Sequence, residues 1–409
     1  MSIHGIQKLC YTKRMKSSHL SSADVAEHYG FFRKKLSLWE GVALIVSGTI
    51  GAGVLGIPFV IAKVGAVVGF FYIIAVGFIM MSLNMLLAQV TVQTGKRFQL
   101  VGLAEEYLGK PGKIIMTTLF YSMLIGVMVI YIIGEGQALA AMFNGNPFTW
   151  SILFFALGSV LILFGLRTVK TVEVLLVLSI LFVVFLIVRW SAPHIQVTNI
   201  QYQNLASLLL PYGVLLFAFH GASSIPEAHS LLENKEKTFK KAIVYSSLIL
   251  ILIYALFAFV VVGVTGGDTT EVATIGLGAI VGPRMVLFGN LFAALAMGTG
   301  FLLTGVILSD SLQWDFKLPR FLSNMVVTLL PLIIFLFGVR GFIATMDIIG
   351  GVFISLEMVL ILAIYWRSKQ RGDLRSHRFG LHHAAWLFKV VVLALLVGSV
   401  YSVSKFFGN

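Results

Sequence analysis

The sequence predicts an all-α integral membrane protein with eleven transmembrane helices, arranged as an inverted repeat of five plus five helices followed by one extra helix. Three observations predict this fold. Of the 409 residues, 58% are apolar and only 11% are charged, which is too little charge to cover a soluble domain. Eleven segments are long and apolar enough to cross a hydrocarbon core of about 30 Å. Two of them, five spans apart, are interrupted near their middles by glycine and proline.

Short polar or basic connections separate the predicted spans. The spans cover residues 39–62, 67–92, 113–143, 150–166, 171–190, 205–232, 242–264, 283–308, 320–337, 341–366 and 384–407. The segment 264–282 carries Asp268 and Glu271 and is predicted to be a loop, with a partly re-entrant course left open. The chain then divides into four parts: an N-terminal arm (1–38), a first repeat (39–190), a second repeat (205–366) and a final helix with a short C-terminus (384–409).

Lysine and arginine gather on one side of the predicted membrane. If the N-terminus is cytoplasmic, the outer segments keep only Lys63, Arg189, Arg284, Arg340 and Lys405. This positive-inside bias predicts a multi-pass protein of the cell membrane, with a cytoplasmic N-terminus and an outer C-terminus. The bias also explains the net charge of +13 without nucleic acid as a partner. The basic segments favour contact with anionic membrane lipids.

The N-terminal arm lacks the apolar core of a signal peptide, since its basic residues are followed by polar ones. We expect a mobile cytoplasmic arm. It carries Cys10, the sole cysteine of the chain, so an internal disulfide and a cysteine metal site are excluded.

The two interrupted spans have similar sequences. The first reads SGTIGAGVLGIP over residues 47–58, with its break predicted at 48–56, and the sixth reads FAFHGASSIPEAHS over 217–230. Both interruptions end in Ile-Pro. Because unpaired backbone groups are costly in hydrocarbon, helices break at this depth where protein or water lines the break. The first and sixth spans cross in opposite directions, which is typical of transporters whose substrate site lies between paired broken helices.

The direction of each half-helix indicates the ligand. The outer half of the first span presents its N-terminus to the centre, so the amides around 51–53 suit a carboxylate. The outer half of the sixth span ends in carbonyls near 219–221, which suit an ammonium group. Together they predict a site for an α-amino acid; the alternative for each break is a kink or a packing face. The candidate binding residues are Thr49, Gly51, Ala52, Gly53, Phe219, His220, Gly221, Ala222 and Ser223.

These two stretches resemble the amino acid/auxin permease branch of the amino acid–polyamine–organocation superfamily, especially its prokaryotic amino acid permeases. GTIGAGVLGIPFVIAKVG in the first span and FAFHGASSIPEA in the sixth carry the resemblance, which extends from Leu38 onward. It implies the leucine-transporter-type fold and secondary transport of amino acids driven by a sodium or proton gradient. By the same analogy, Tyr131 is a candidate gate or carboxylate contact.

The coupling ion is open between sodium and the proton. In sodium-coupled relatives, carbonyls of the first break and hydroxyls of the eighth span bind the ion; here the candidates are Gly48 and Thr299. The next position, often serine in relatives, is Gly300, and this departure favours the proton. Glu227 follows Pro226 and matches a glutamate of the family motif. We expect it to exchange protons, to cap the inner half-helix, or to do both.

Other ionisable residues within the spans are candidates by default, because inserting them is costly. His220 either contacts substrate, shuttles protons or makes a neutral hydrogen bond across helices. Glu135 shares a helix face with Tyr131 and is expected to pair with a polar group near the outer vestibule. Asp347 and Glu357 serve gating or packing. No metal is predicted, since the cluster His377, His382 and His383 lacks carboxylates or cysteine in register.

Other function classes fit less well. The chain has no phosphate-binding loop, no paired catalytic carboxylates and no metal cluster, so we expect no enzyme and no cofactor beyond a coupling ion. A channel needs polar groups along a continuous pore, whereas polarity here is concentrated at one depth. The prediction is a monomeric transporter importing neutral amino acids, with large or aromatic ones favoured by the small residues in both breaks. The alternative is a membrane receptor that binds amino acids without transporting them.

Overall fold

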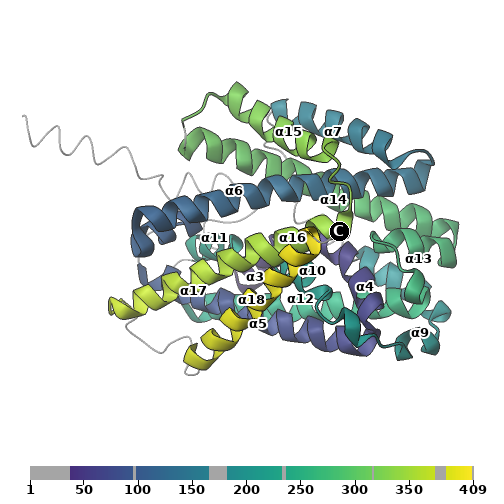
Figure 1. The fold of residues 1–409 in the computed structure, drawn as a ribbon, viewed down its shortest axis with the longest axis horizontal. Helices are drawn as coiled ribbons and strands as arrows, with labels where there is room; N and C mark the ends of the chain where they lie inside the picture. Colours follow the sequence, from purple (N-terminus) through teal and green to yellow (C-terminus); the bar gives the residue numbers. More distant parts are fainter. Residues whose placement is uncertain are drawn as a thin grey trace, which may run out of the picture.

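The computed structural model describes residues 37–94, 98–164, 182–232, 236–315, 317–373 and 384–407, and all regular secondary structure in these ranges is helical (Figure 1). Five helical stretches are long and apolar enough to cross a membrane, and shorter apolar helices supply further segments. The five are Ala66–Thr94, Leu100–Phe143, Glu236–Asp268, Pro283–Gln313 and Phe342–Gln370. The all-α membrane fold is confirmed, and the count of eleven spans stays a prediction.

The first predicted span consists of two half-helices, α3 (Leu38–Ser47) and α4 (Gly53–Val64). A capping box starts α3: Glu40 N–H donates to Ser37 Oγ (3.3 Å), and Ser37 N–H donates to the Glu40 carboxylate (2.7 Å). The break covers 48–52, which is shorter than the predicted 48–56. Pro58 lies inside α4 and does not end the helix. A proline at this position removes one helical hydrogen bond.

The sixth predicted span is also divided, into α10 (Pro211–Ala218) and α11 (Ser224–Leu231), with a break at 219–223. Pro226 is the third residue of α11, in the first turn, where backbone N–H groups have no helical partner in any case. Both breaks therefore lie where glycine and small residues predicted them, and both Ile-Pro pairs belong to the helix that follows.

Most other spans match their predicted positions. The fifth is an exception, since 165–181 lie outside the described residues; within the described residues its C-terminal part, Phe182–His194, is helical. The remaining helices are α5 (Ala66–Thr94), α7 (Pro147–Phe164), α12 (Glu236–Thr265), α14 (Pro283–Asp315), α15 (Arg320–Leu336) and α18 (Ala384–Phe407). Short elements between the fifth and sixth predicted spans are η1 (Ala192–His194), α9 (Val197–Gln201) and η2 (Leu205–Ser207).

Three segments differ from the sequence prediction. Helix α6 (Leu100–Phe143) begins well before residue 113 and changes direction at Gly109, whose φ of 73° suits glycine. The segment 264–282, predicted as a loop, contains η3 (Gly266–Asp268) and α13 (Ala273–Val281). The tenth span is α16 (Phe342–Ile348), a π-helical turn η4 (Ile349–Ile354) and α17 (Ser355–Gln370). Such π turns occur often at functional sites.

Buried apolar side chains form one core that includes both half-helix pairs, whereas large apolar side chains also point outward. Phe71, Leu252 and Phe337 are 67%, 67% and 87% exposed. An outward apolar surface of this kind fits a hydrocarbon environment and would be a liability in water.

Candidate functional site

The two breaks lie directly against each other through small residues. A Cβ added to Gly48 would lie 3.0 Å from Ser224 Cβ, and one added to Gly53 would lie 2.5 Å from Ala218 Cα. Gly221 packs against the side chain of Thr49 in the same way. Substrate-site candidates from spans one and six are therefore neighbours in space, and no larger residue fits between them.

Backbone amides are available at the start of α4. The N–H groups of Gly48, Thr49 and Ile50 donate to carbonyls at the end of α3, at 3.0, 3.2 and 2.9 Å. Within the described residues, the next amides along the chain, 51–53, donate to no acceptor. These N–H groups sit at the positive end of a half-helix, which is the arrangement that binds a carboxylate. Gly51 is also partly exposed.

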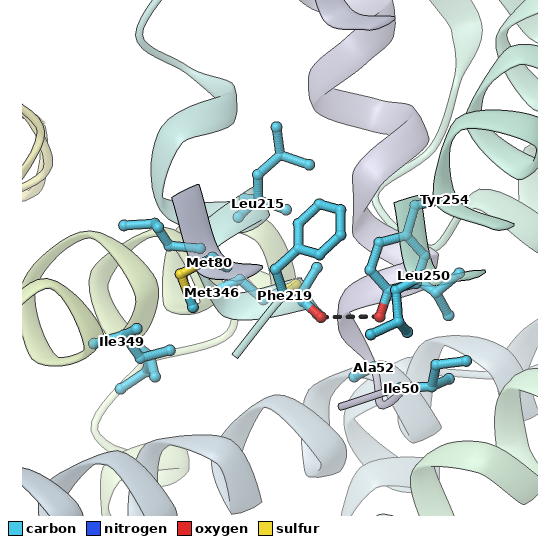
Figure 2. Packing of buried hydrophobic residues seen from close by; sticks show 14 of the residues in the cluster. Ile50, Ala52, Met80, Leu215, Phe219, Leu250, Tyr254, Met346 and Ile349 are labelled. Carbon is cyan, nitrogen blue, oxygen red and sulfur yellow. Dashed lines mark hydrogen bonds between the residues drawn. The ribbon is translucent and has the colours of Figure 1, made fainter. Parts of the chain in front are cut away.

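Backbone carbonyls are available in the second break, but fewer than predicted. Ala218 O accepts from the Tyr254 hydroxyl of α12 at 2.9 Å (dashed line in Figure 2). Gly221 O accepts from the Ser224 hydroxyl at 2.6 Å and from the Ser224 amide at 3.1 Å. The carbonyls of Phe219 and His220 accept no hydrogen bond from any described residue. These two carbonyls are therefore free to accept a hydrogen bond from a ligand.

Tyr131 of α6 bounds the first break on another side. A Cβ on Gly51 would lie 3.2 Å from its hydroxyl oxygen, and a Cβ on Gly300 of α14 would lie 2.6 Å from the same atom. The hydroxyl also has Thr304 of α14 as a hydrogen-bond partner. The glycine at position 300, noted above as a departure from sodium-coupled relatives, therefore makes room for the Tyr131 ring.

Apolar side chains surround this backbone site. Figure 2 shows Ile50 and Ala52 of the first break with Phe219 of the second, near Met346 and further apolar residues of α5, α10, α12 and η4. The rings of Phe219 and Tyr254 meet edge to face, with centroids 4.9 Å apart. A substrate with a large apolar side chain matches such surroundings better than a charged one.

The sequence pattern of the Tryptophan/tyrosine permease family matches residues 34–402. The chain belongs to this family. The permease is similar to "Tyrosine-specific transport system 1" of Haemophilus influenzae, with 27% identity covering 88% of this chain and 95% of the relative. It is also similar to "Glutamine transporter 2" of Aliivibrio fischeri, with 23% identity covering 82% and 91%.

Solved structures share the fold. MhsT in complex with L-phenylalanine superposes on the permease with a TM-score of 0.64 and 14% identity, covering 90% of this chain and 97% of MhsT. A manganese transporter of Eremococcus coleocola superposes with a TM-score of 0.65 and 14% identity, covering 92% of this chain and 90% of that transporter. The leucine-transporter-type fold is confirmed. The chain is a multi-pass membrane protein and not an enzyme, and it belongs to a family of amino acid transporters, the Tryptophan/tyrosine permeases. The amino acid/auxin permease branch stays a resemblance.

Several predicted residues lie beside the free backbone groups in different roles. The Thr49 hydroxyl donates to Ile45 O at 2.8 Å and so closes the end of α3. Ala222 is fully buried, whereas Ser223 is partly exposed. Gly48 is exposed, although it packs on Ser224. Their part in substrate binding stays a prediction.

The coupling-ion candidates are not gathered into one site by their hydrogen bonds. The Thr299 hydroxyl donates back to its own helix, to Leu295 O at 2.8 Å and Ala296 O at 3.2 Å. Glu227 is half-buried in the first turn of α11, and within the described residues its carboxylate makes no hydrogen bond. Neither arrangement selects an ion.

One pairing was not foreseen from the sequence. His220 Nε2 of the second break lies 3.0 Å from Glu357 Oε2 of α17. Both residues stand out in the sequence as ionisable groups at depth, but nothing in the spacing of spans six and ten pairs them. The sequence-predicted Glu135 instead contacts the Gly298 backbone of α14, and Asp347 lies 3.4 Å from the Ser402 hydroxyl of α18.

No group of three His, Cys, Asp or Glu side chains suited to a metal occurs in the part of the chain that the structure describes. The histidines at 377, 382 and 383 lie outside these residues.

Proposed function

We propose that this permease imports a neutral amino acid, large or aromatic, by alternating access coupled to a proton or sodium gradient, with the proton favoured. The observation that carries the proposal is the pairing of free amides at 51–53 with free carbonyls at Phe219 and His220, on two breaks that lie against each other. An α-amino acid has a matching anion and cation on one carbon atom.

In the proposed complex, the substrate carboxylate accepts hydrogen bonds from the amides at the start of α4. The Tyr131 hydroxyl, near Gly51, is placed to donate one more. The ammonium group binds the carbonyls of Phe219 and His220. No charged side chain is needed, so the substrate side chain alone decides selectivity.

Aromatic substrates are favoured for two reasons. The breaks are surrounded by apolar and aromatic side chains such as Phe219 and Tyr254. Relatives are described as tyrosine-specific, and MhsT was solved with L-phenylalanine. Because one relative is described as a glutamine transporter, a smaller neutral amino acid is the second candidate substrate.

The alternative is a receptor that binds the same substrate at the same site without moving it. Relatives described as transport systems favour transport. Counterflow separates the two: proteoliposomes loaded with unlabelled substrate should accumulate labelled substrate if the protein is a transporter. Binding without such exchange would establish the receptor.

The substrate can be found by a thermal-shift screen of the twenty amino acids on purified protein. We expect tyrosine, tryptophan or phenylalanine to raise the melting temperature most. Labelled uptake of each hit with an imposed pH gradient, and separately with a sodium gradient, then identifies the coupling ion. Stabilisation only by charged amino acids would contradict the proposed substrate class.

The proposal includes the arrangement in the membrane. The N-terminus is cytoplasmic, the C-terminus is outside, and the monomer is the functional unit. The coupling ion is the only cofactor. The basic cytoplasmic segments contact anionic lipids.

A further inference from the structure

His220 and Glu357 form a buried pair at the centre of the molecule. His220 belongs to the second break, next to Phe219, and its side chain is 12% exposed. Glu357 is the third residue of α17, just after the π turn η4, and its side chain is 2% exposed. Their nearest atoms, Nε2 and Oε2, are 3.0 Å apart.

The pair is incompletely satisfied. The second carboxylate oxygen, Oε1 of Glu357, is buried and has no hydrogen-bond partner among the described residues. Nε2 of His220 lies within ion-pair distance of Oε2 without the geometry of a full hydrogen bond. Buried carboxylates are normally paired and fully hydrogen-bonded, because an uncompensated charge is costly there. An unmet oxygen therefore indicates a ligand of this site.

A proton is the ligand that this chemistry fits. With one exchangeable proton the pair is neutral overall, either as imidazolium with carboxylate or as imidazole with carboxylic acid. Without it, the pair carries one negative charge in a buried place, which is strongly disfavoured. Proton occupancy thus decides whether the second break can close away from water.

Packing holds the two partners within reach. The Tyr212 hydroxyl of α10 hydrogen-bonds the Ser355 hydroxyl at the start of α17 (2.8 Å). Gly350 of η4 packs directly against the Gly213 carbonyl of α10, with no space for a side chain. The outer half of span six and the π turn are thereby fixed together. Opening of the pair must then come from the break that carries His220.

Other titratable groups on the surrounding elements make different contacts in the described residues. Tyr254 of α12 donates to Ala218 O, Glu135 of α6 contacts Gly298, and Asp347 of α16 contacts Ser402. Further titratable groups on these elements include Tyr72 on α5, Tyr131 on α6, Tyr212 on α10, Glu227 on α11 and Tyr365 on α17. No lysine or arginine is paired with Glu357 among the described residues.

We propose that the His220–Glu357 pair binds the proton whose gradient drives uptake. The inference rests on the proposed function and deepens it, because it moves proton coupling from Glu227, the residue suggested by the sequence, to a pair shared between the second break and α17. The proposal also gives His220 two roles: its backbone carbonyl binds the substrate, and its side chain binds the proton.

The test compares two activities of Glu357→Gln in proteoliposomes: labelled tyrosine exchange by counterflow, and tyrosine accumulation driven by an imposed pH gradient without sodium. Exchange needs binding and alternating access but no net proton flow. We expect exchange within about threefold of wild type and a loss of at least tenfold in pH-driven accumulation. Glu357→Asp, which keeps a titratable group, should retain part of the pH-driven accumulation.

A binding measurement supplies a second readout. For wild type, tyrosine affinity in detergent should change with pH over a range in which the tyrosine amino group stays protonated, and Glu357→Gln should remove that change. Asp347→Asn is the matched control, since it neutralises a buried acid of the same span that contacts Ser402. It should leave the ratio of accumulation to exchange unchanged.

Three results would overturn the proposal: unchanged pH-driven accumulation in Glu357→Gln, loss of exchange together with accumulation, or wild-type uptake driven by sodium alone. Loss of pH-driven accumulation in Glu227→Gln with normal accumulation in Glu357→Gln would return the role to Glu227. Absence of counterflow in wild type would instead contradict the proposed function itself.

Discussion

Glycines of the first break look equivalent in the sequence, yet each meets different atoms. A side chain on Gly53 would strike the Ala218 backbone, whereas one on Gly51 would meet only the Tyr131 hydroxyl within 4 Å. Gly53 therefore allows the outer half-helices α4 and α10 to touch. Gly51 keeps open the space in front of the free amides.

We predict that Gly51→Val lowers tyrosine uptake at least tenfold, because the isopropyl group occupies the place of the substrate carboxylate. Gly53→Val should also lower the melting temperature, since backbone must move, while Gly51→Val should melt near wild type. Initial uptake rates normalised to protein in the membrane test this. Gly267→Val is the control, since a Cβ added there would meet no atom within 4 Å. Normal uptake by Gly51→Val would remove the proposed site.

Tyr131→Phe is expected to raise KM for tyrosine about three- to tenfold, because one hydrogen bond to the carboxylate contributes about 1 kcal/mol. The matched control is Tyr121→Phe, which removes another hydroxyl that links α6 to α14, at Ser311 (2.6 Å). That variant should lose stability without a change in KM. An unchanged KM in Tyr131→Phe would assign the hydroxyl to helix packing alone.

At the scale of elements, α12 supports the end of α10. The Tyr254 hydroxyl donates a hydrogen bond to the carbonyl of Ala218. Without it, this carbonyl would be unsatisfied at a buried helix end. This contact also limits how many carbonyls the second break offers to a substrate. The carbonyls of Phe219 and His220 are left for the proposed site.

Tyr254→Phe should destabilise the permease by about 1–3 kcal/mol, the cost of leaving a buried carbonyl unpaired. Thermal unfolding in detergent measures this as a lower melting temperature. Tyr245→Phe on the same helix is the comparison, since Tyr245 is 38% exposed and stacks on Trp39. Equal effects of the two substitutions would mean that the hydrogen bond to Ala218 has no special role.

Span positions could be predicted because apolar length reflects bilayer thickness: the last span, 384–407, coincides with α18. The breaks followed from glycine and proline at matching positions. Hydropathy carries no information on the turn at Gly109, or on α13 in a segment that looked like a loop. The π turn was equally hidden, since it depends on packing against α10 and not on composition.

The candidate site was predictable to the same extent. Small residues indicated where backbone groups become free, and polarity of the half-helix ends indicated amides and carbonyls. Loss of the Gly221 carbonyl to Ser224 was not predictable, because it depends on a local rotamer. The His220–Glu357 pair was missed because the π turn changes which face α17 presents.

For the whole molecule, the charge bias predicts which side each loop faces, and the single cysteine allows a direct test. Cys10 should react with a membrane-impermeant maleimide only after cells are permeabilised. In a Cys10→Ser background, Gly267→Cys, in the exposed η3 segment, should react in intact cells. Labelling of Cys10 in intact cells would reverse the proposed orientation.

The close contact between the two breaks has a consequence for the path of the substrate. The two breaks are in van der Waals contact through glycine, serine, threonine and alanine, and these contacts leave no space for a substrate between them. A transported substrate is therefore expected to pass along the side where Tyr131 faces Gly51 and Gly300. That side belongs to α6 and α14, so we expect the half-helix pair to move against these two helices in the proposed transport cycle.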